Sequence, residues 1–252
     1  MIIDHNNPVY ENRRRYMGEN RYNGAYYYSR EIVEIMIPLV ETDRNWITVN
    51  VPHQGCDHAI VFIHNNLDAA AYDHLKEYDD LVLVCGIPET CEKVAHLGKA
   101  IYLPLSVDVA AVERFKLEKS RDTAFVGRPA KRQMPGVELP DGVDFLEGMP
   151  RDYLLMNMAQ YRRVYAVGRA AIEARILGCE VLPYDPRFPD PEIWEVLDTR
   201  EAAKILQEKL DLIDGEVMLL GIDQEDEDGH TTDEAGRDPA VRKKSAEERR
   251  GR

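Results

Sequence analysis

The sequence predicts an α/β protein made of two small Rossmann-like lobes with parallel sheets, followed by a disordered, charged C-terminal tail. Short β-branched runs alternate with helix-like segments over most of the 252 residues, which is typical of sheets covered by helices. The alternation runs twice, on either side of the polar stretch "LEKSRD". After residue 222 the chain is almost entirely polar and cannot bury enough apolar surface to offset its ordering entropy. We expect lobes over residues 1–117 and 118–222 and a tail over 223–252.

The first half contains four strand-like runs, at 46–51, 59–65, 81–86 and 100–105. They are mostly apolar rather than alternating, which predicts a parallel sheet buried on both faces. Helix-start residues lie between or beside these runs: Ser29 as a cap, Asn66 opening a helix towards Tyr78, Pro88 in a first turn with Gly98 at the far end, and Asp108 as a cap.

The second half repeats the pattern. Strand-like runs lie at 123–127, 143–148, 163–168 and 180–184, and helices are expected at 150–161, 169–177 and 199–213, the last capped by Thr199. Two similar halves of this kind predict two separate parallel sheets.

Composition excludes several classes of protein. The formal net charge is −14 and the pI is about 5.0, which argues against a general nucleic-acid binder. The N-terminus does not resemble a signal peptide, and no run of about 18 apolar residues predicts a membrane span. The four cysteines form no CxxC pair, and Cys85 and Cys179 look like small core residues. We expect a reduced, cytoplasmic protein whose tail is either solubilising or a contact for an acidic protein partner.

The loop "FVGRPAKRQ", residues 125–133, is the first candidate for a ligand site. Open α/β sheets bind ligands at the carboxyl ends of their strands, and here a strand-like run ends at Gly127. Arg128, Lys131 and Arg132 follow within a few residues, and closely spaced cations suit a diphosphate. The alternative is an exposed loop with solvated charges.

The second candidate is "GRAAIE", which begins at Gly168. A helix that starts there offers free N–H groups and a positive dipole end to an anion. Arg169 would add a positive charge, and Glu173 could accept hydrogen bonds from ribose hydroxyls. The alternative is a purely structural pair, because Arg169 and Glu173 stand four residues apart on one helix face.

Two further candidates lie in the first half. His64 ends an apolar run and could be a general base or a substrate contact, although such a histidine is often a structural hydrogen-bonding group. Asn23 and Gly24 form a turn signal that could lie against a substrate. GxSxG, Walker A, HExxH and GxGxxG patterns are all absent from the sequence, and no metal site or cofactor is expected.

Three quoted stretches together resemble a known family. "AFVGR", "VDFLEGMPRDYLLMNMAQYRRVYAV" and "GRAAIEARILGCEVLPYD" are similar to the C-terminal lobe of GT-B fold glycosyltransferases, over roughly residues 100–215. In that family a strand ending in Gly-Arg opens the lobe, and a later segment of the type G-x-x-x-x-E-A-x-x-x-G-x-x-V holds the sugar nucleotide. The matching positions are Gly168, Glu173, Ala174, Gly178 and Val181.

The resemblance implies a glycosyltransferase that uses a nucleotide-sugar donor and an unidentified acceptor. It implies that Arg128 and Lys131 contact the diphosphate and Glu173 the ribose. It also places the Asn23–Gly24 turn at the cleft between the lobes and His64 opposite the acceptor. Tyr165 stands where retaining members often carry an acidic residue, so a non-catalytic nucleotide or nucleotide-sugar binding or regulatory protein of the same fold is the alternative. A plain α/β scaffold protein is a third possibility.

Overall fold

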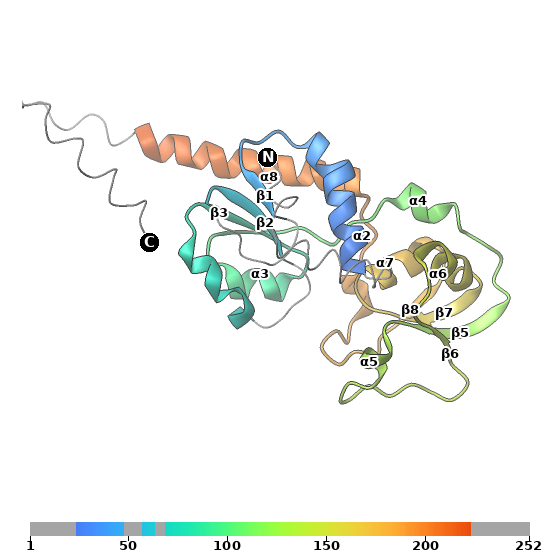
Figure 1. Cartoon of the computed structure of the whole chain (residues 1–252). Coiled ribbons are helices and arrows are strands. Elements are labelled where there is room, and N and C mark those ends of the chain that lie inside the picture. Colours follow the sequence, from blue (N-terminus) through green and yellow to red (C-terminus); the bar gives the residue numbers. More distant parts are fainter. Residues whose placement is uncertain (1–23, 48–56, 64–68, 223–252) are drawn as a thin grey trace, which may run out of the picture. The chain divides into compact units, whose positions relative to one another are not determined.

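The protein contains two four-stranded parallel sheets with helices packed on them, as the sequence predicted (Figure 1). The computed structural model describes residues 24–47, 57–63 and 69–222. His64, Asn23 and the tail predicted for residues 223–252 lie outside the described residues. The strand order is β1-β2-β3-β4 in the first sheet and β6-β5-β7-β8 in the second.

The first sheet is buried on both faces. Its strands are β1 (Asn45–Ile47), β2 (Ala59–Ile63), β3 (Leu81–Cys85) and β4 (Lys99–Tyr102). Every residue of β2 and β3 is buried. Alternate side chains enter two different apolar clusters, with Ile60 and Phe62 in one and Val61 and Ile63 in the other. This alternation confirms the prediction made from uniformly apolar runs.

The helices of the first half differ in detail from the prediction. Ser29 lies inside α2 (Gly24–Glu31) rather than capping it, and the chain continues as a π-helical segment η2 (Ile32–Met36) and a 3-10 turn η3 (Ile37–Leu39). Before β3 the chain forms a 3-10 helix, η4 (Ala69–Glu77).

Pro88 does begin α3 (Pro88–Val94), as its fixed φ favours. Gly98 does not cap that helix, because the helix ends at Val94, four residues earlier. A Cβ atom at Gly98 would lie 2.7 Å from the carbonyl oxygen of Leu81. Close approach to the neighbouring chain therefore explains this glycine better than the predicted capping role.

The second sheet consists of β5 (Arg121–Val126), β6 (Asp144–Leu146), β7 (Tyr161–Tyr165) and β8 (Glu180–Leu182). Two helices, α6 (Arg151–Met158) and α7 (Arg169–Ile176), lie on the same side of this sheet (Figure 1). The shorter elements are α4 (Val109–Glu113), which Asp108 caps as predicted, α5 (Pro129–Arg132) and η5 (Pro191–Ile193). All neighbouring strands pair in parallel, so their carboxyl ends share one edge.

The last helix, α8 (Thr199–Ile222), is longer than the predicted segment and has a different cap. Asp198, not Thr199, closes its first turn, because Asp198 Oδ1 accepts a hydrogen bond from the backbone of Arg200 and the Asp198 carbonyl accepts one from Ala202. The Thr199 hydroxyl instead faces Glu31. Thr199 was a reasonable candidate cap by residue type, but its neighbour occupies the capping position.

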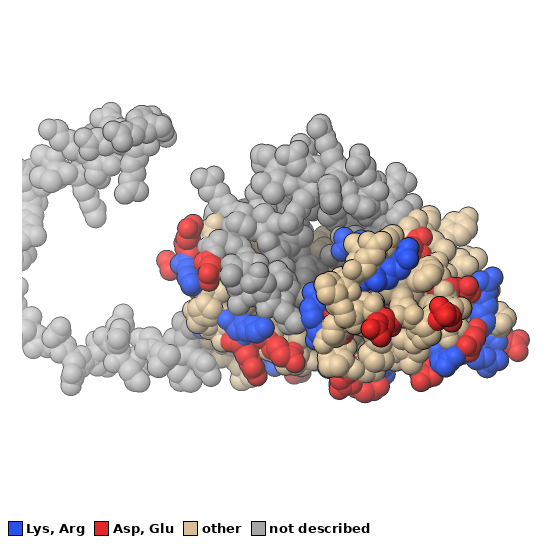
Figure 2. Space-filling view, turned by 90° about the horizontal axis from the view of Figure 1, so that it is seen from below, with Lys and Arg blue, Asp and Glu red and all other residues tan. Residues whose placement is uncertain are grey.

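Both sheets belong to one compact unit that ends at Ile213, and the helical residues from Asp214 onward are assigned to a second unit. No helix in the described part of the chain is long and apolar enough to cross a membrane. Basic and acidic side chains are interspersed on the described part of the face seen in Figure 2. Cys85 and Cys179 are buried, as predicted, and carry free thiols.

Candidate functional site

The carboxyl end of β5 presents the basic loop that the sequence singled out. Gly127 follows the strand directly, and a Cβ atom there would lie 2.8 Å from the ring of Phe125, so the position needs glycine for close packing. Arg128 is extended, with φ −88° and ψ 149°, and Pro129 then starts α5. The short helix returns the chain so that Lys131 comes close to Arg128.

Arg128 and Lys131, which we call the cationic pair, form no direct ion pair among the described residues, and neither side chain makes a hydrogen bond there. Burial lowers the pKa of the half-buried Lys131, and the neighbouring Arg128 guanidinium lowers it further, while the Asp185 carboxylate opposes this change. The next basic residue is different. Arg132 donates to Glu147 Oε1 at 3.0 Å and lies 4.7 Å over the ring of Phe145. The two cations nearest the strand end therefore lack a direct ion pair among the described residues, although Asp185 acts on Lys131 electrostatically.

The loop after β8 packs against the basic loop. The ring of Phe125 in β5 meets the ring of Tyr184 edge-on, with 4.9 Å between centroids, and a Cβ atom at Gly136 would lie 3.4 Å from Pro186. This second loop carries its own ion pair, in which Arg187 donates to both oxygens of the buried Asp185 at 2.9 and 2.6 Å. Although burial opposes it, this pairing lowers the pKa of Asp185.

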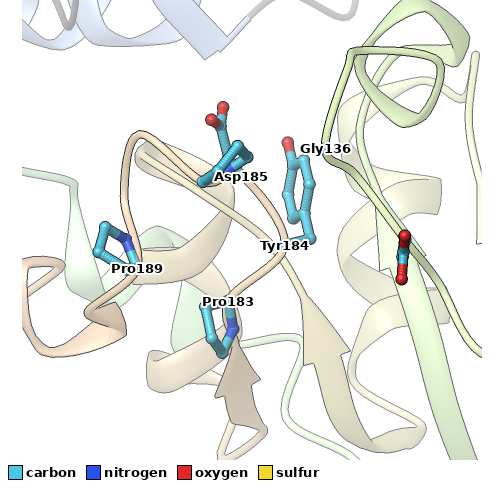
Figure 3. Close-up of a pocket in the computed structure, with 7 residues that line it drawn as sticks. Gly136, Pro183, Tyr184, Asp185 and Pro189 are labelled. Atoms are coloured by element: carbon cyan, nitrogen blue, oxygen red, sulfur yellow. The ribbon is translucent and has the colours of Figure 1, made fainter.

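A pocket of about 280 Å³ opens between these two loops, shown in Figure 3. Its lining combines proline rings, glycine backbone and three polar side chains: Gly136, Glu138, Pro183, Tyr184, Asp185, Pro186 and Pro189. The side chains of Tyr184 and Asp185 point the same way in the close-up. The volume is suited to a fragment of a small-molecule ligand rather than to a whole drug-sized molecule.

The second predicted site, at the start of α7, lies after the neighbouring strand β7. Gly168 has φ 63° and ψ −140°, a backbone conformation that favours glycine. Its carbonyl accepts hydrogen bonds from Ala171 and Ile172, so the helix begins as predicted. Since β5 and β7 pair directly, Gly127 and Gly168 leave adjacent strands at the same edge of the sheet.

Arg169 and Glu173 belong to a closed set of four buried charged groups, which we call the buried quartet: Glu31, Arg151, Arg169 and Glu173. Arg169 donates to both oxygens of Glu31, at 3.0 and 2.5 Å, and its Nε donates to Glu173 Oε1 at 2.7 Å. Arg151 donates to the same Oε1 at 2.9 Å. The four side chains are at most 14% exposed. Two cations and two anions thus neutralise one another away from solvent.

Within the quartet, the pKa of Arg169 is raised overall. Burial alone would lower the pKa of Arg169, but Glu173 and Glu31 raise it. Glu173 Oε2 accepts no hydrogen bond from the described residues, whereas Oε1 accepts three. The predicted pair of Arg169 and Glu173 on α7 therefore exists, and Glu173 Oε2 remains a hydrogen-bond acceptor without a donor among the described residues.

Glu31 is the member of the quartet that sequence reasoning missed. Besides Arg169, its Oε2 accepts a hydrogen bond from the backbone of Asp108 at 3.0 Å and lies 3.5 Å from the Thr199 hydroxyl. Glu31 therefore joins α2 to the segments before α4 and at the start of α8. The only signal in the sequence is an acidic residue at the end of an amphipathic helix, which is usually solvated.

The predicted site residues thus form two groups. Arg128 and Lys131 lie together at the end of β5, and Arg169 and Glu173 lie together in the quartet. Gly24 is the first residue of α2, while its predicted turn partner Asn23 and the candidate base His64 lie outside the described residues. Tyr184 and Asp185, which sequence reasoning did not assign to the site, join the cationic pair through the loop after β8.

Comparison with known proteins identifies no family for this chain. The likeness to GT-B fold glycosyltransferases therefore depends on the quoted stretches and on the two-sheet architecture alone. No protein-family model matches the chain, and neither a curated protein nor a solved structure matches it significantly.

Proposed function

We propose that the chain binds a nucleotide-activated sugar at the carboxyl edge of the second sheet and transfers the sugar to an acceptor. The observation that carries the proposal is the cationic pair, two positive charges at the end of a parallel strand that form no direct ion pair among the described residues. Placing two cations side by side is unfavourable, and a bound diphosphate would relieve it. Strand ends of this kind are where α/β sheets bind ligands.

Each candidate residue has a physical role in the proposal. Arg128 would grip phosphate oxygens through its planar fork, and Lys131 would add a point charge. Together they would stabilise the negative charge that develops on the departing diphosphate. The start of α7 after Gly168 would add N–H groups and the helix dipole. The free oxygen of Glu173 would accept a ribose hydroxyl. The proposal requires no metal, because side chains supply the positive charge.

His64 remains the proposed general base if the reaction inverts the anomeric centre. The Asn23–Gly24 turn remains a proposed substrate contact. Both proposals depend on the family resemblance and on position in the sequence.

A binding or regulatory protein without turnover is the second candidate. Tyr165, half-buried at the end of β7, occupies the position where retaining members of the resembled family often carry an acidic residue. In addition, Glu173 already shares one oxygen with two arginines. These two features favour holding a ligand over reacting with it.

Titration calorimetry and thermal shift with UDP, GDP and their sugars test the proposal. At least one ligand should bind, and Arg128→Ala and Lys131→Ala should each weaken it about tenfold or more, because a hydrogen bond to a charged group contributes about 1.5–3 kcal/mol. Arg162→Ala is the matched control. Arg162 is an exposed cation in the amino-terminal half of β7, so its loss changes net charge without touching the strand end.

The outcomes separate clearly. Absence of binding by every nucleotide would eliminate both candidate functions. Equal weakening by Arg128→Ala and Arg162→Ala would mean that overall charge, not the strand end, attracts the ligand. Donor hydrolysis that disappears in His64→Ala would identify an enzyme, while tight binding without hydrolysis or transfer would favour the non-catalytic alternative.

A further inference from the structure

Two cysteines lie together at the carboxyl end of the first sheet. Cys85 is the last residue of β3, and Cys91 lies in the first turn of α3, which begins three residues after Cys85. Both belong to the same apolar cluster, Cys85 as a buried member and Cys91 as a half-buried residue packed against it. The two thiols are close enough to act on each other. The chain reversal between β3 and α3 thus brings two thiols together.

The turn between the strand and the helix fixes this arrangement. Gly86 follows Cys85, and a Cβ atom at Gly86 would lie 2.7 Å from the side chain of Leu105, so close packing requires glycine there. At the other end of the turn, the backbone N–H of Cys91 donates to the Ile87 carbonyl at 3.1 Å. Because β3 and α3 anchor both ends of a short turn, the two sulfur atoms are held near each other.

The two thiols differ in their access to an oxidant. Cys91 is half-buried, whereas Cys85 has no exposed surface. Burial raises the pKa of Cys91, and Glu92 raises it further, while the Cys85 thiol and the Lys209 ammonium oppose this. Burial and the neighbouring Cys91 raise the pKa of Cys85, whose thiolate would also act on Tyr28 of α2. An oxidant therefore reaches Cys91 first, and Cys85 is placed to react with Cys91.

We propose that Cys85 and Cys91 form a redox modification site, in which a peroxide converts the two thiols into a reversible disulfide. The Cys91 thiolate attacks one peroxide oxygen, the O–O bond breaks, and hydroxide leaves as Cys91 becomes a sulfenic acid. The Cys85 thiolate then attacks Cys91 Sγ, the S–S bond forms, the S–O bond breaks, and a second hydroxide leaves. The two hydroxides take up the two thiol protons, so two thiols and one hydrogen peroxide give one disulfide and two waters.

Cys179 provides the internal comparison. It is also buried and free, and burial raises its pKa although Lys119 opposes this. Its Sγ lies 3.2 Å from the Lys119 ammonium and 3.4 Å from the Met158 carbonyl oxygen, and no thiol of the described residues acts on it. An oxidant that reached Cys179 would therefore add oxygen without closing a disulfide in the described part of the chain.

Mass spectrometry of tryptic peptides from the full chain tests the proposal. Trypsin cleaves after Lys76 and Lys93, so Cys85 and Cys91 fall in one peptide, residues 77–93, which contains no methionine. After mild hydrogen peroxide and alkylation of the remaining thiols, this peptide should have lost two hydrogen atoms and taken up no alkyl group. Dithiothreitol should restore both thiols by exchange.

The rate of this conversion should rise with pH. A thiolate is the nucleophile, and the raised pKa of Cys91 keeps the thiolate scarce near neutral pH. The rate should therefore increase about tenfold for each pH unit up to about pH 8. A rate that is independent of pH would contradict an attack by the Cys91 thiolate.

Single variants separate the roles of the two thiols. In Cys91→Ser the buried Cys85 should remain a free thiol, because no sulfenic acid forms beside it. In Cys85→Ala the resolving thiol is gone, so dimedone should trap Cys91 as a sulfenic acid. Cys91→Ser alters only a half-buried atom, so its result does not depend on how Cys85→Ala folds. In every protein the peptide 176–187, which carries Cys179, should stay alkylated.

Three results would overturn the proposal. The first is complete alkylation of both thiols after oxidation, and the second is sulfinic acid in the peptide 77–93 that dithiothreitol does not reverse. The third is a cross-linked peptide that contains Cys56, which lies outside the described residues. A loss of two hydrogen atoms that disappears in both variants supports the disulfide. None of these outcomes involves a nucleotide, so this inference and the proposed function stand or fail separately.

Discussion

Two charged regions of the molecule differ in one respect. In the buried quartet every cation has an anion, and all four side chains are nearly inaccessible. In the cationic pair, Arg128 and Lys131 lie close together, and neither forms a direct ion pair among the described residues. Both regions were candidates for the same donor site from sequence. The geometry suggests different roles, with the quartet holding the protein together and the pair available to a ligand.

This difference illustrates how a charged residue near a strand end can be interpreted. A neutralised, hydrogen-bonded group has already gained the interaction that a ligand would offer. A charged group without a direct ion pair has not, so an oppositely charged ligand can supply a new favourable interaction. Residue type and spacing alone do not separate the two cases, because the partner Glu31 lies 138 residues away from Arg169.

The largest expected effect is on stability, from Arg169→Met. Removing this cation leaves Glu31 and Glu173 buried with too little positive charge, and loss of one partner from a buried ion pair typically costs about 3–5 kcal/mol. Urea unfolding followed by circular dichroism should show a correspondingly lower free energy of unfolding.

Arg128→Met is the matched control for that measurement. Arg128 is exposed and unpaired, so its replacement should change the free energy of unfolding by no more than about 0.5 kcal/mol. Similar losses of unfolding free energy in Arg169→Met and Arg128→Met would show that the buried quartet contributes no more to stability than the exposed Arg128 does.

An intermediate effect is expected from salt. Exposed charges are screened within about 10 Å at 0.1 M salt, whereas buried pairs are screened much less. Raising the sodium chloride concentration from about 0.05 to 0.5 M should therefore weaken UDP or GDP binding at the cationic pair several-fold. The stability difference between the unmodified protein and Arg169→Met should change little. A stability difference that collapses in salt would mean that the quartet is open to water.

The smallest effect comes from a third ionic cluster, which is paired but exposed. His58 Nδ1 lies 2.6 Å from Asp80 Oδ2 and its Nε2 lies 2.9 Å from Asp43 Oδ1, with Arg44 also paired to Asp80. Hydrogen bonds to Asp80 and Asp43 raise the pKa of His58, although burial and Arg44 oppose this. Exposed pairs usually contribute no more than about 1 kcal/mol, so His58→Gln should cost far less than Arg169→Met.

The pH dependence of this cluster has a definite sign. The raised pKa of His58 means that its stabilisation is complete below about pH 6.5, its unfolded value, and is lost as the pH rises through the folded pKa. The lowered pKa values of Asp43 and Asp80 add stability that is present above about pH 3.9 and lost below. Urea midpoints should therefore differ more between the unmodified protein and His58→Gln at pH 6 than at pH 9. An equal difference at both values would rule out this titration.

Strand positions were largely predictable from the sequence because uniformly apolar runs have few alternatives in a parallel sheet. The run at 81–86 became β3 (Leu81–Cys85), and the run at 180–184 became β8 (Glu180–Leu182). Helix ends were less predictable, since Asp198 and Thr199 are both good caps. In the structure Asp198 accepts the hydrogen bond from the first turn, and the Thr199 hydroxyl lies 3.5 Å from Glu31.

The sequence predicted only the part of the candidate site whose residues are close together in the chain. Arg128 and Lys131 are three residues apart, so the sequence already places them together. Tyr184 is far from both in sequence and carries no recognisable motif. Its ring reaches the end of β5 only through packing against Phe125, with 4.9 Å between the centroids, which no pattern of residues reports.

The long sequence separation between Glu31 and its partner has a consequence during synthesis. A ribosome adds about 5–20 residues per second, so Arg169 follows Glu31, 138 residues earlier, by roughly 7 to 28 s. During that interval the nascent first lobe has a carboxylate at the end of α2 without its main cation. In nascent chains arrested before Arg169, proteases should therefore cleave α2 more readily than in the full chain. Synthesis of the second lobe should then make α2 more resistant.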